Sequence, residues 1–106
     1  MNDNRNERMQ EAVREVAAEF LSREANRNSL ITVTRTDLST DGKSCIIYIS
    51  VFPETAEVPA LAFANRNRSE LSEFFKKRIR SRLPPHIEFV IDAGEKNRQR
   101  LDELSE

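Results

Sequence analysis

The sequence predicts a small α+β domain whose elements follow the order helix, strand, strand, helix, helix, strand, before a helical tail. An apolar stripe at helical spacing opens the chain, and two β-branched runs then flank a glycine-containing turn. Later, Pro84 and Pro85 separate a second helical stripe from a short alternating run. The chain has 106 residues, 38% of them hydrophobic, which is enough for one modest core. We therefore expect an open three-stranded sheet with helices on one face over residues 1–94, and a charged C-terminal helix or tail over residues 95–106.

The first half of the chain predicts one helix and a hairpin. Residues 5–24 place these apolar side chains on a single helical face: Met9, Ala12, Val13, Val16, Ala17, Phe20 and Leu21. Residues 29–38 and 44–52 predict two strands, and Gly42 lies in the turn between them. The odd positions of the second strand are wholly apolar and should face the core. Alternation puts Ile31 and Val33 on that face and the threonines at positions 32, 34 and 36 on the other.

The second half predicts two helices and one strand. A short helix over residues 56–64 should bury Leu61 and Phe63. The next helix should begin at an N-cap, either Asn67 or Ser69, and its inward side chains should be Leu71, Phe74, Phe75 and Ile79. After the two prolines, alternation points Ile87, Phe89 and Ile91 to one side and His86, Glu88 and Asp92 to the other.

Charge is segregated along the chain. Residues 64–82 hold seven Lys/Arg and two Glu, a net charge of +5, so the rest of a chain of net charge −1 carries −6. Cations near a helix C-terminus also interact favourably with the helix dipole, and each stabilises the helix by about 0.3–1 kcal/mol. This effect accounts for Arg80 and Arg82 without a bound ligand. It does not explain Lys76 and Lys77 together with basic residues at the opposite end. The pattern favours a polyanion-binding face over a plain solvated one.

Composition excludes several kinds of site. Two glycines, Gly42 and Gly94, cannot form a phosphate-binding loop, a dinucleotide-binding loop or a GxxG loop. One His and one Cys cannot form a Cys/His zinc centre or an internal disulfide. Cys45 could be imagined as a nucleophile beside His86, but strand parity places Cys45 in the core and His86 on the outside. We expect no catalysis, no cofactor and no metal.

The sequence also bears on cellular location and on how a nucleic acid would be recognised. No apolar run is long enough for a membrane span, and the N-terminus lacks a signal sequence, so we expect a cytoplasmic protein. Tyr48 is the only plausible base-stacking side chain, with Phe52 a weaker second. Recognition of shape and phosphate therefore fits better than stacking of single-stranded bases.

The order of elements is that of type II KH domains, and three segments resemble the ribosome-binding factor A family in particular. They are Ile31-Thr-Val-Thr-Arg-Thr-Asp-Leu-Ser39 with Asp41 and Ile47-Tyr-Ile-Ser-Val-Phe52, Arg80-Ser-Arg-Leu-Pro-Pro-His-Ile-Glu-Phe-Val-Ile-Asp92, and Arg100-Leu-Asp-Glu-Leu104. The chain departs from the family at residues 25–29, where members typically carry D-P-R-L-G. It departs again at Asn67-Arg68-Ser69, which takes the place of the interhelical A-x-G kink.

The resemblance implies a non-enzymatic RNA-binding factor in ribosome biogenesis and rRNA processing. Such a protein binds the immature small (30S) ribosomal subunit near the neck and the 3′ region of 16S rRNA, assists late maturation and leaves before translation. We expect a monomer with no small-molecule substrate and no membrane partner. Its expected RNA-binding residues are Arg66, Arg68, Ser69, Lys76, Lys77, Arg80 and Arg82. The alternative is a protein–protein interaction module that uses the basic helix face or an open sheet edge.

Overall fold

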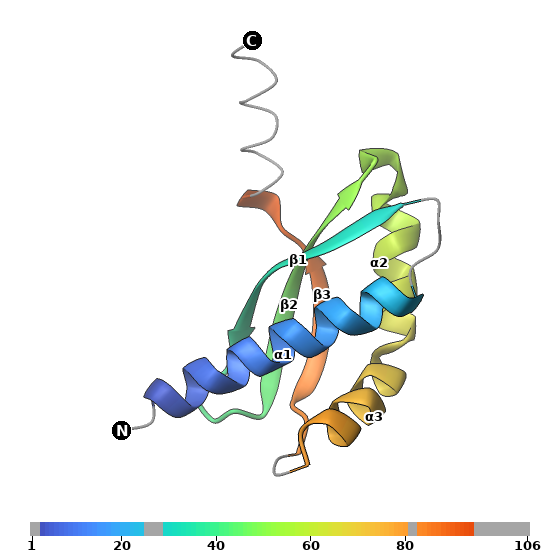
Figure 1. Cartoon of the computed structure of the whole chain (residues 1–106). Helices are drawn as coiled ribbons and strands as arrows, with labels where there is room; N and C mark the ends of the chain where they lie inside the picture. The colour runs from blue at the N-terminus through green and yellow to red at the C-terminus, as the bar shows by residue number, and fades with distance from the viewer. Residues whose placement is uncertain (1–2, 25–28, 81–82, 95–106) are drawn as a thin grey trace.

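The computed structural model describes residues 3–24, 29–80 and 83–94. Its elements are α1 (Asp3–Glu24), β1 (Leu30–Leu38), β2 (Ser44–Phe52), the 3-10 helix η1 (Glu54–Ala56), α2 (Glu57–Arg66), α3 (Arg68–Arg78) and β3 (His86–Ile91). Figure 1 shows the three strands in the order β1-β2-β3, with β1 antiparallel and β3 parallel to β2. The expected order of elements is confirmed, and the parallel pair gives the sheet the type II KH arrangement.

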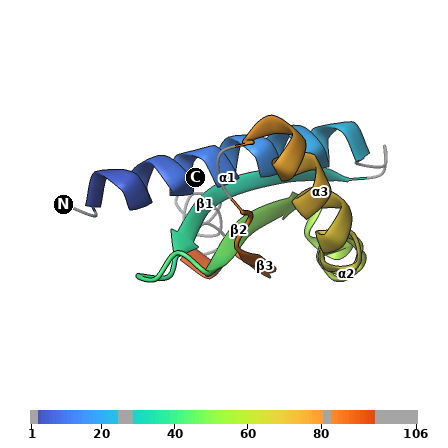
Figure 2. The ribbon, with the colours of Figure 1, turned by 90° about the horizontal axis from the view of Figure 1, so that it is seen from below.

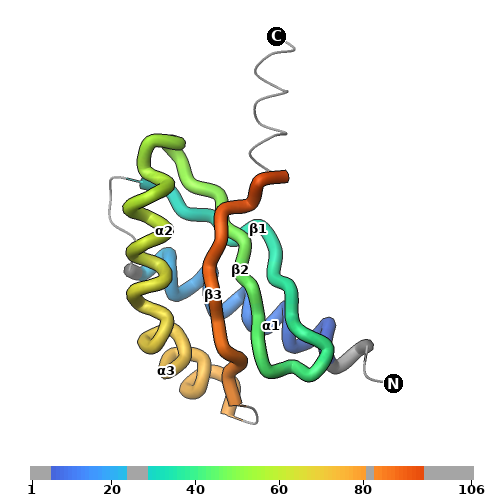
Figure 3. The backbone as a smooth tube through the Cα atoms, turned by 180° about the vertical axis from the view of Figure 1, so that it is seen from behind, coloured from blue at the N-terminus to red at the C-terminus, as the bar shows by residue number. Residues whose placement is uncertain are grey.

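The helices are not spread evenly around the sheet. In Figure 2, α1 and α3 lie over one face, and α2 runs alongside β3. Figure 3 shows the opposite face, which no described helix covers. The expectation of a three-stranded sheet with helices on one face is confirmed.

The core lies between the sheet and the helices. From β2 it takes the four odd positions, Cys45, Ile47, Ile49 and Val51, as their alternation predicted. From α1 it takes the predicted apolar stripe, except that Ala12 is half-buried: Met9, Val13, Val16, Ala17, Phe20 and Leu21. The apolar face of the helix and the apolar face of the strand, each predicted from its own sequence period, therefore pack together in one core.

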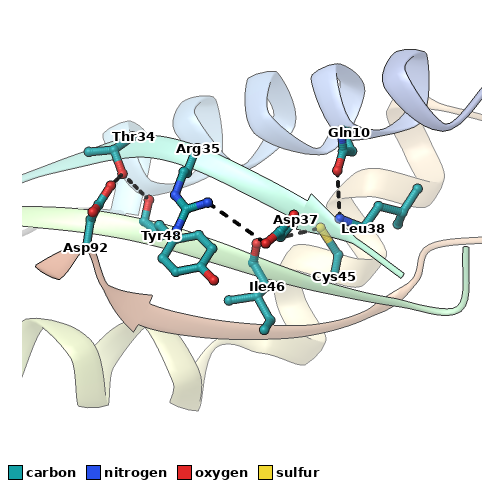
Figure 4. A network of polar contacts seen from close by, with 9 residues as sticks. All are labelled: Gln10, Thr34, Arg35, Asp37, Leu38, Cys45, Ile46, Tyr48 and Asp92. Atoms are coloured by element: carbon teal, nitrogen blue, oxygen red, sulfur yellow. Dashed lines mark hydrogen bonds and ion pairs between the residues drawn. The ribbon is translucent and has the colours of Figure 1, made fainter. Parts of the chain in front are cut away.

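The first strand differs from its predicted alternation because it contains an irregularity. The register between β1 and β2 shifts between Val33 and Arg35, so Thr34 is an extra residue. Because of this extra residue, the even-numbered side chains after Val33 point toward the core side. The expected outward placement of Thr34 and Thr36 is therefore wrong. The Thr34 hydroxyl donates to Asp92 Oδ2 at 2.5 Å, and the Thr36 hydroxyl donates to the Gln10 carbonyl at 2.9 Å (Figure 4 shows the first).

The same contact shows that the expected orientation of Asp92, at the end of β3, is wrong. Alternation put Asp92 on the outer face, but its side chain is buried with 8% exposure. Its backbone N–H donates to the Ile49 carbonyl at 2.8 Å, which continues the β2–β3 ladder, and the Thr34 hydroxyl meets its carboxylate. A buried carboxylate needs such donors, and the bulge supplies one.

The helices α2 and α3, which connect β2 to β3, also differ in detail from expectation. In α2 the buried residues are Ala60 and Ala64, whereas Leu61 and Phe63 are only half-buried. Alanine has no side chain beyond Cβ, so α2 packs closely against the core through these two positions. The helix α3 ends at Arg78, because Ile79 has an extended conformation (φ −120°, ψ 87°), so Arg80 follows the helix instead of lying on it. Leu71 and Phe75 are buried as expected, and Phe74 is half-buried.

On each of the two edge strands, β1 and β3, a side-chain amide forms hydrogen bonds with the backbone of one residue. The Leu38 N–H of β1 donates to Gln10 Oε1 at 2.8 Å. On β3, the Phe89 N–H donates to Asn65 Oδ1 at 3.0 Å, and Asn65 Nδ2 donates back to the Phe89 carbonyl at 3.2 Å. The Asn65 amide thus pairs with Phe89 as a neighbouring strand would. Backbone groups bonded in this way are not free to pair with another chain.

Three expectations fall on residues outside the described ranges. They are the C-terminal helix or tail at residues 95–106, most of the departure at residues 25–29, and the placement of Arg82.

The core position of Phe89 leads to a stability prediction. Its side chain has 2% exposure, and Phe89→Ala should lower the free energy of unfolding by about 3–5 kcal/mol, because the lost ring leaves a cavity. Urea unfolding followed by circular dichroism measures the change. The control is Glu88→Ala on the exposed outer face, which should change stability by less than about 0.5 kcal/mol. Equal losses in the two variants would contradict the orientation of β3.

The bulge leads to a second prediction. Thr34→Val keeps the side-chain shape but removes the hydroxyl that donates to Asp92, and should cost about 1–3 kcal/mol of stability. Thr32→Val makes the same chemical change on the same strand, before the irregularity, and should be near neutral or stabilising. If Thr32→Val proved the more damaging substitution in urea unfolding, the irregularity in β1 would lie elsewhere.

Candidate nucleic-acid interface

The junction between α2 and α3 is a break of one residue, Asn67. Its Nδ2 donates to the Phe63 carbonyl at 2.7 Å, and its backbone N–H approaches the Phe63 and Ala64 carbonyls at 3.2 Å. Asn67 occupies the N-cap position predicted for α3, but its side chain bonds back to α2 and makes no cap hydrogen bond. Its φ of −101° is ordinary for any residue, so this junction requires no glycine. The missing A-x-G sequence is thus replaced by an asparagine-stabilised turn.

The last turn of α3 carries the densest positive charge in the described chain. Lys76, Lys77 and Arg78 are all exposed there, and Arg80 follows immediately and is also exposed. We call these four residues the basic turn. Lys76 Nζ lies 3.3 Å from Glu73 Oε1, and Arg78 forms an ion pair with Glu19 of α1. Lys77 has no ion pair with any described residue.

The other predicted RNA-binding residues are distributed around the crossover. Arg66 lies on α2, beside a groove whose other walls include Ile31 and Phe63. Arg68 is half-buried, and its Nε donates to the Asn65 carbonyl at 3.0 Å, so it stabilises the helix junction. Ser69 and Lys77 line the same hollow between α1 and α3. The structure therefore groups Ser69 with the basic turn and places Arg66 apart from it.

The hollow between α1 and α3 is the feature that sequence reasoning missed. Its volume is about 350 Å³, and Phe20 and Phe74 form its aromatic part, with ring centroids 5.8 Å apart. Arg23 of α1 also lines it, with its guanidinium carbon 5.5 Å from the Phe74 ring centroid, and Arg78 lies at the same distance from that ring. The one sequence signal is that Arg23 follows Phe20 at the basic end of the first helical stripe.

The helix-free face of the sheet holds a second aromatic contact. Arg35 of β1 places its guanidinium carbon 3.8 Å from the centroid of the Tyr48 ring, and its Nη1 lies 3.9 Å from Asp37 Oδ2 (Figure 4). The predicted stacking residue Tyr48 therefore already has one ring face covered by an arginine. Phe52, the weaker candidate, is 73% exposed at the end of β2.

The imagined nucleophile–base pair does not form. Cys45 has 2% exposure on the core side of β2, and burial raises the pKa of its thiol to about 11. His86 is exposed at the start of β3, where it pairs in register with Ser44 and so lies on the opposite face of the sheet. The interpretation of Cys45 as a small core residue is confirmed.

Comparison with known proteins identifies the family. The sequence model of the family described as ribosome-binding factor A matches residues 5–105. The chain belongs to the ribosome-binding factor A family. It is 30% identical over 105 residues to ribosome-binding factor A of Carboxydothermus hydrogenoformans, covering 96% of this chain and 84% of that one. It is 28% identical over 104 residues to the Coprothermobacter proteolyticus protein, covering 96% and 76%.

Solved structures of the family share the fold. The crystal structure of ribosome-binding factor A from Thermus thermophilus superposes with a TM-score of 0.68 at 28% identity, over 79% of this chain and 92% of that one. A homology model of the Thermus thermophilus protein, fitted into a cryo-EM map of a 30S complex with ribosome-binding factor A, gives a TM-score of 0.61 at 27% identity, over 74% and 86%. None of the helices among the described residues has the length and apolar character needed to cross a membrane.

The raised pKa of the Cys45 thiol predicts a pH dependence of stability. The pKa is higher in the folded than in the unfolded chain, so this contribution is complete below about pH 9, near the ordinary pKa of the thiol, and is lost as pH rises toward the folded pKa of about 11. The loss should reach about 2 kcal/mol by pH 11.

Cys45→Ala removes the titrating group and serves as the comparison. The difference in unfolding free energy between the natural chain and this variant, measured in urea from pH 8 to 11, should shift progressively against the natural chain. A difference that stays constant over this range would mean that the thiol is not desolvated in the folded state.

Proposed function

We propose that this chain is a ribosome assembly factor that binds the immature small (30S) ribosomal subunit and its 16S rRNA and assists late maturation without catalysis. The observation that carries the proposal is the match to the family over residues 5–105 in a chain whose fold presents an exposed basic turn. A cytoplasmic location follows from this role, because assembling subunits are found there.

The mechanism that the charges support is electrostatic docking. Lys76, Lys77 and Arg80 project from one end of α3, where they can neutralise phosphates and release condensed counterions. The packed body behind them fixes the orientation of these cations, so the surface recognises the shape of a folded RNA. Arg66 and Arg68 contribute at the junction between α2 and α3. The net charge of −6 outside residues 64–82 opposes binding by other faces.

Sedimentation of the tagged protein through sucrose gradients of cell extract tests the proposal. We expect migration with free small subunits at low salt, loss of this migration at high salt, and absence from translating ribosomes. Migration only at the top of the gradient under both conditions would contradict it. Association that survives nuclease treatment would favour the protein-interaction alternative.

Charge reversal of the basic turn predicts both an affinity and a salt effect. The triple variant Lys76→Glu, Lys77→Glu, Arg80→Glu should weaken binding to purified small subunits. It should also reduce the slope of log affinity against log salt by about 2–3 units, because three phosphate contacts are lost. Filtration binding over a salt series measures both quantities.

A second triple variant is the matched control. Arg8→Glu, Arg14→Glu and Arg35→Glu make the same change in net charge on α1 and β1, away from the basic turn. This variant should keep most of the salt slope. Equal slopes in the two variants would show that net charge, not the basic turn, governs binding.

A further inference from the structure

The hollow between α1 and α3 brings together charges of both signs that do not pair with one another. Its charged lining residues are Arg23, Lys77, Glu70 and Glu73. Glu73 pairs with Lys76, which leaves Arg23, Glu70 and Lys77. Within the described residues, none of these three takes part in an ion pair or a side-chain hydrogen bond. Both the cations and the carboxylate therefore remain available to a ligand that carries anionic groups and N–H donors together.

The aromatic part of the hollow suits a planar group. Phe74 is half-buried and packs at a tilt of 51° against Phe20, which anchors the ring to the core. The guanidinium carbons of Arg23 and Arg78 each lie 5.5 Å from the Phe74 centroid, so a base on this ring would lie beside both groups. Unstacked bases are held in proteins by phenylalanine rings and by guanidinium planes, and both are present here.

The hollow has a volume of about 350 Å³. This lies at the lower end of the range of about 300–1,000 Å³ for small-molecule sites, so the hollow has room for one nucleotide. The hollow also adjoins the basic turn through Lys77, so the phosphates on either side of that nucleotide would meet positive charge.

The free carboxylate distinguishes among the four bases. Glu70 offers two acceptor oxygens and no donor at neutral pH. Guanine presents two adjacent donors on its Watson–Crick edge, N1–H and the 2-amino group, which match a carboxylate in a bidentate manner. Adenine and cytosine place a single amino group next to a ring nitrogen that would repel the carboxylate, and uracil places its one N–H between two carbonyls.

We propose that the hollow between α1 and α3 binds one unstacked guanosine of a single-stranded RNA segment. Its base lies on Phe74, its Watson–Crick edge donates to Glu70, and its flanking phosphates contact Arg23 and Lys77. The proposal rests on the proposed function in taking RNA as the partner, and it adds a base-specific contact to a surface that otherwise reads shape and phosphate.

Short RNAs test the base preference directly. Fluorescence anisotropy at low salt compares five-nucleotide oligouridine with the same RNA carrying a central guanosine, adenosine or inosine. We expect the guanosine RNA to bind about tenfold more tightly than the adenosine RNA, as a good bidentate base contact provides. Inosine keeps N1–H but lacks the 2-amino group, so it should fall between them. Equal affinities for all four RNAs would overturn the proposal.

Substitution of the carboxylate separates base recognition from charge. Glu70→Gln removes one negative charge, so it should raise the affinity for plain oligouridine and at the same time abolish the guanosine preference. Glu88→Gln makes the same change on the helix-free face of the sheet and should leave the preference intact. A preference that persists in Glu70→Gln would place guanosine recognition elsewhere and overturn the proposal.

Substitution of the ring tests stacking. Phe74→Leu keeps an apolar side chain and should lower the affinity for the guanosine RNA about fivefold or more, because base–aromatic stacking contributes substantially to single-strand binding. Urea unfolding confirms that the variant is folded. A folded variant with unchanged affinity would remove Phe74 from the site and overturn the proposed pose.

Small-subunit binding, measured in parallel, keeps the two proposals distinct. Subunit binding without any base preference would overturn the guanosine site and leave the proposed function intact. A guanosine preference that disappears in Glu70→Gln, in a chain that does not bind subunits, would support the site and overturn the assembly-factor role.

Discussion

The structure depends on the central strand β2, which is the only described strand bonded on both sides. Its inner face consists of four buried side chains, and the polar or exposed positions all fall on the other face. Because β3 runs parallel to β2, the chain must return to the end where β2 began before β3 can pair with it. The helices α2 and α3 are that return path. The basic turn at the end of α3 therefore lies beside the start of β3, where the His86 N–H donates to the Lys43 carbonyl at 2.8 Å.

The crossover also explains why the helix junction tolerates an unusual sequence. Ala60 and Ala64 bring α2 close to the core. The Asn67 amide bonds to the Phe63 carbonyl before the break, and the Asn65 amide bonds to the backbone of Phe89 in β3. Each of these contacts is between a side chain and the main chain, so they fix the direction in which α3 leaves the junction. An amide at Asn67 takes the role that a small or flexible residue would otherwise have in this turn.

The functional surface mixes cations and acids at short range. Lys76 lies beside Glu73 and Arg78 pairs with Glu19, and exposed pairs of this kind contribute little stability. They do divide the cations into paired and unpaired ones. Lys77, Arg80 and Arg23 are among the cations that have no ion pair with any described residue, so an RNA phosphate can bind them without first displacing a carboxylate. Paired and unpaired cations together favour binding that is specific in place but reversible with salt.

The sequence by itself determined the order of elements, the apolar stripe of α1, the core face of β2 and the position of Cys45. These follow from local periodicity, which a folded chain keeps because one face of each element must be buried. The segregation of positive charge into residues 64–82 is also a property of the sequence alone. So are the three segments that resemble the family, whose assignment the match over residues 5–105 confirms.

Tertiary structure decided the features that depend on contacts between distant residues. The bulge at Thr34 reverses the alternation of β1 and brings the Thr34 hydroxyl to Asp92, which is distant in sequence. The helix α3 stops at Arg78, so the basic residues fall partly on a helix and partly beyond it. The hollow beside Phe74 exists only because α1 and α3 pack together, and no spacing within either helix could have predicted that Arg23 and Lys77 line the same site.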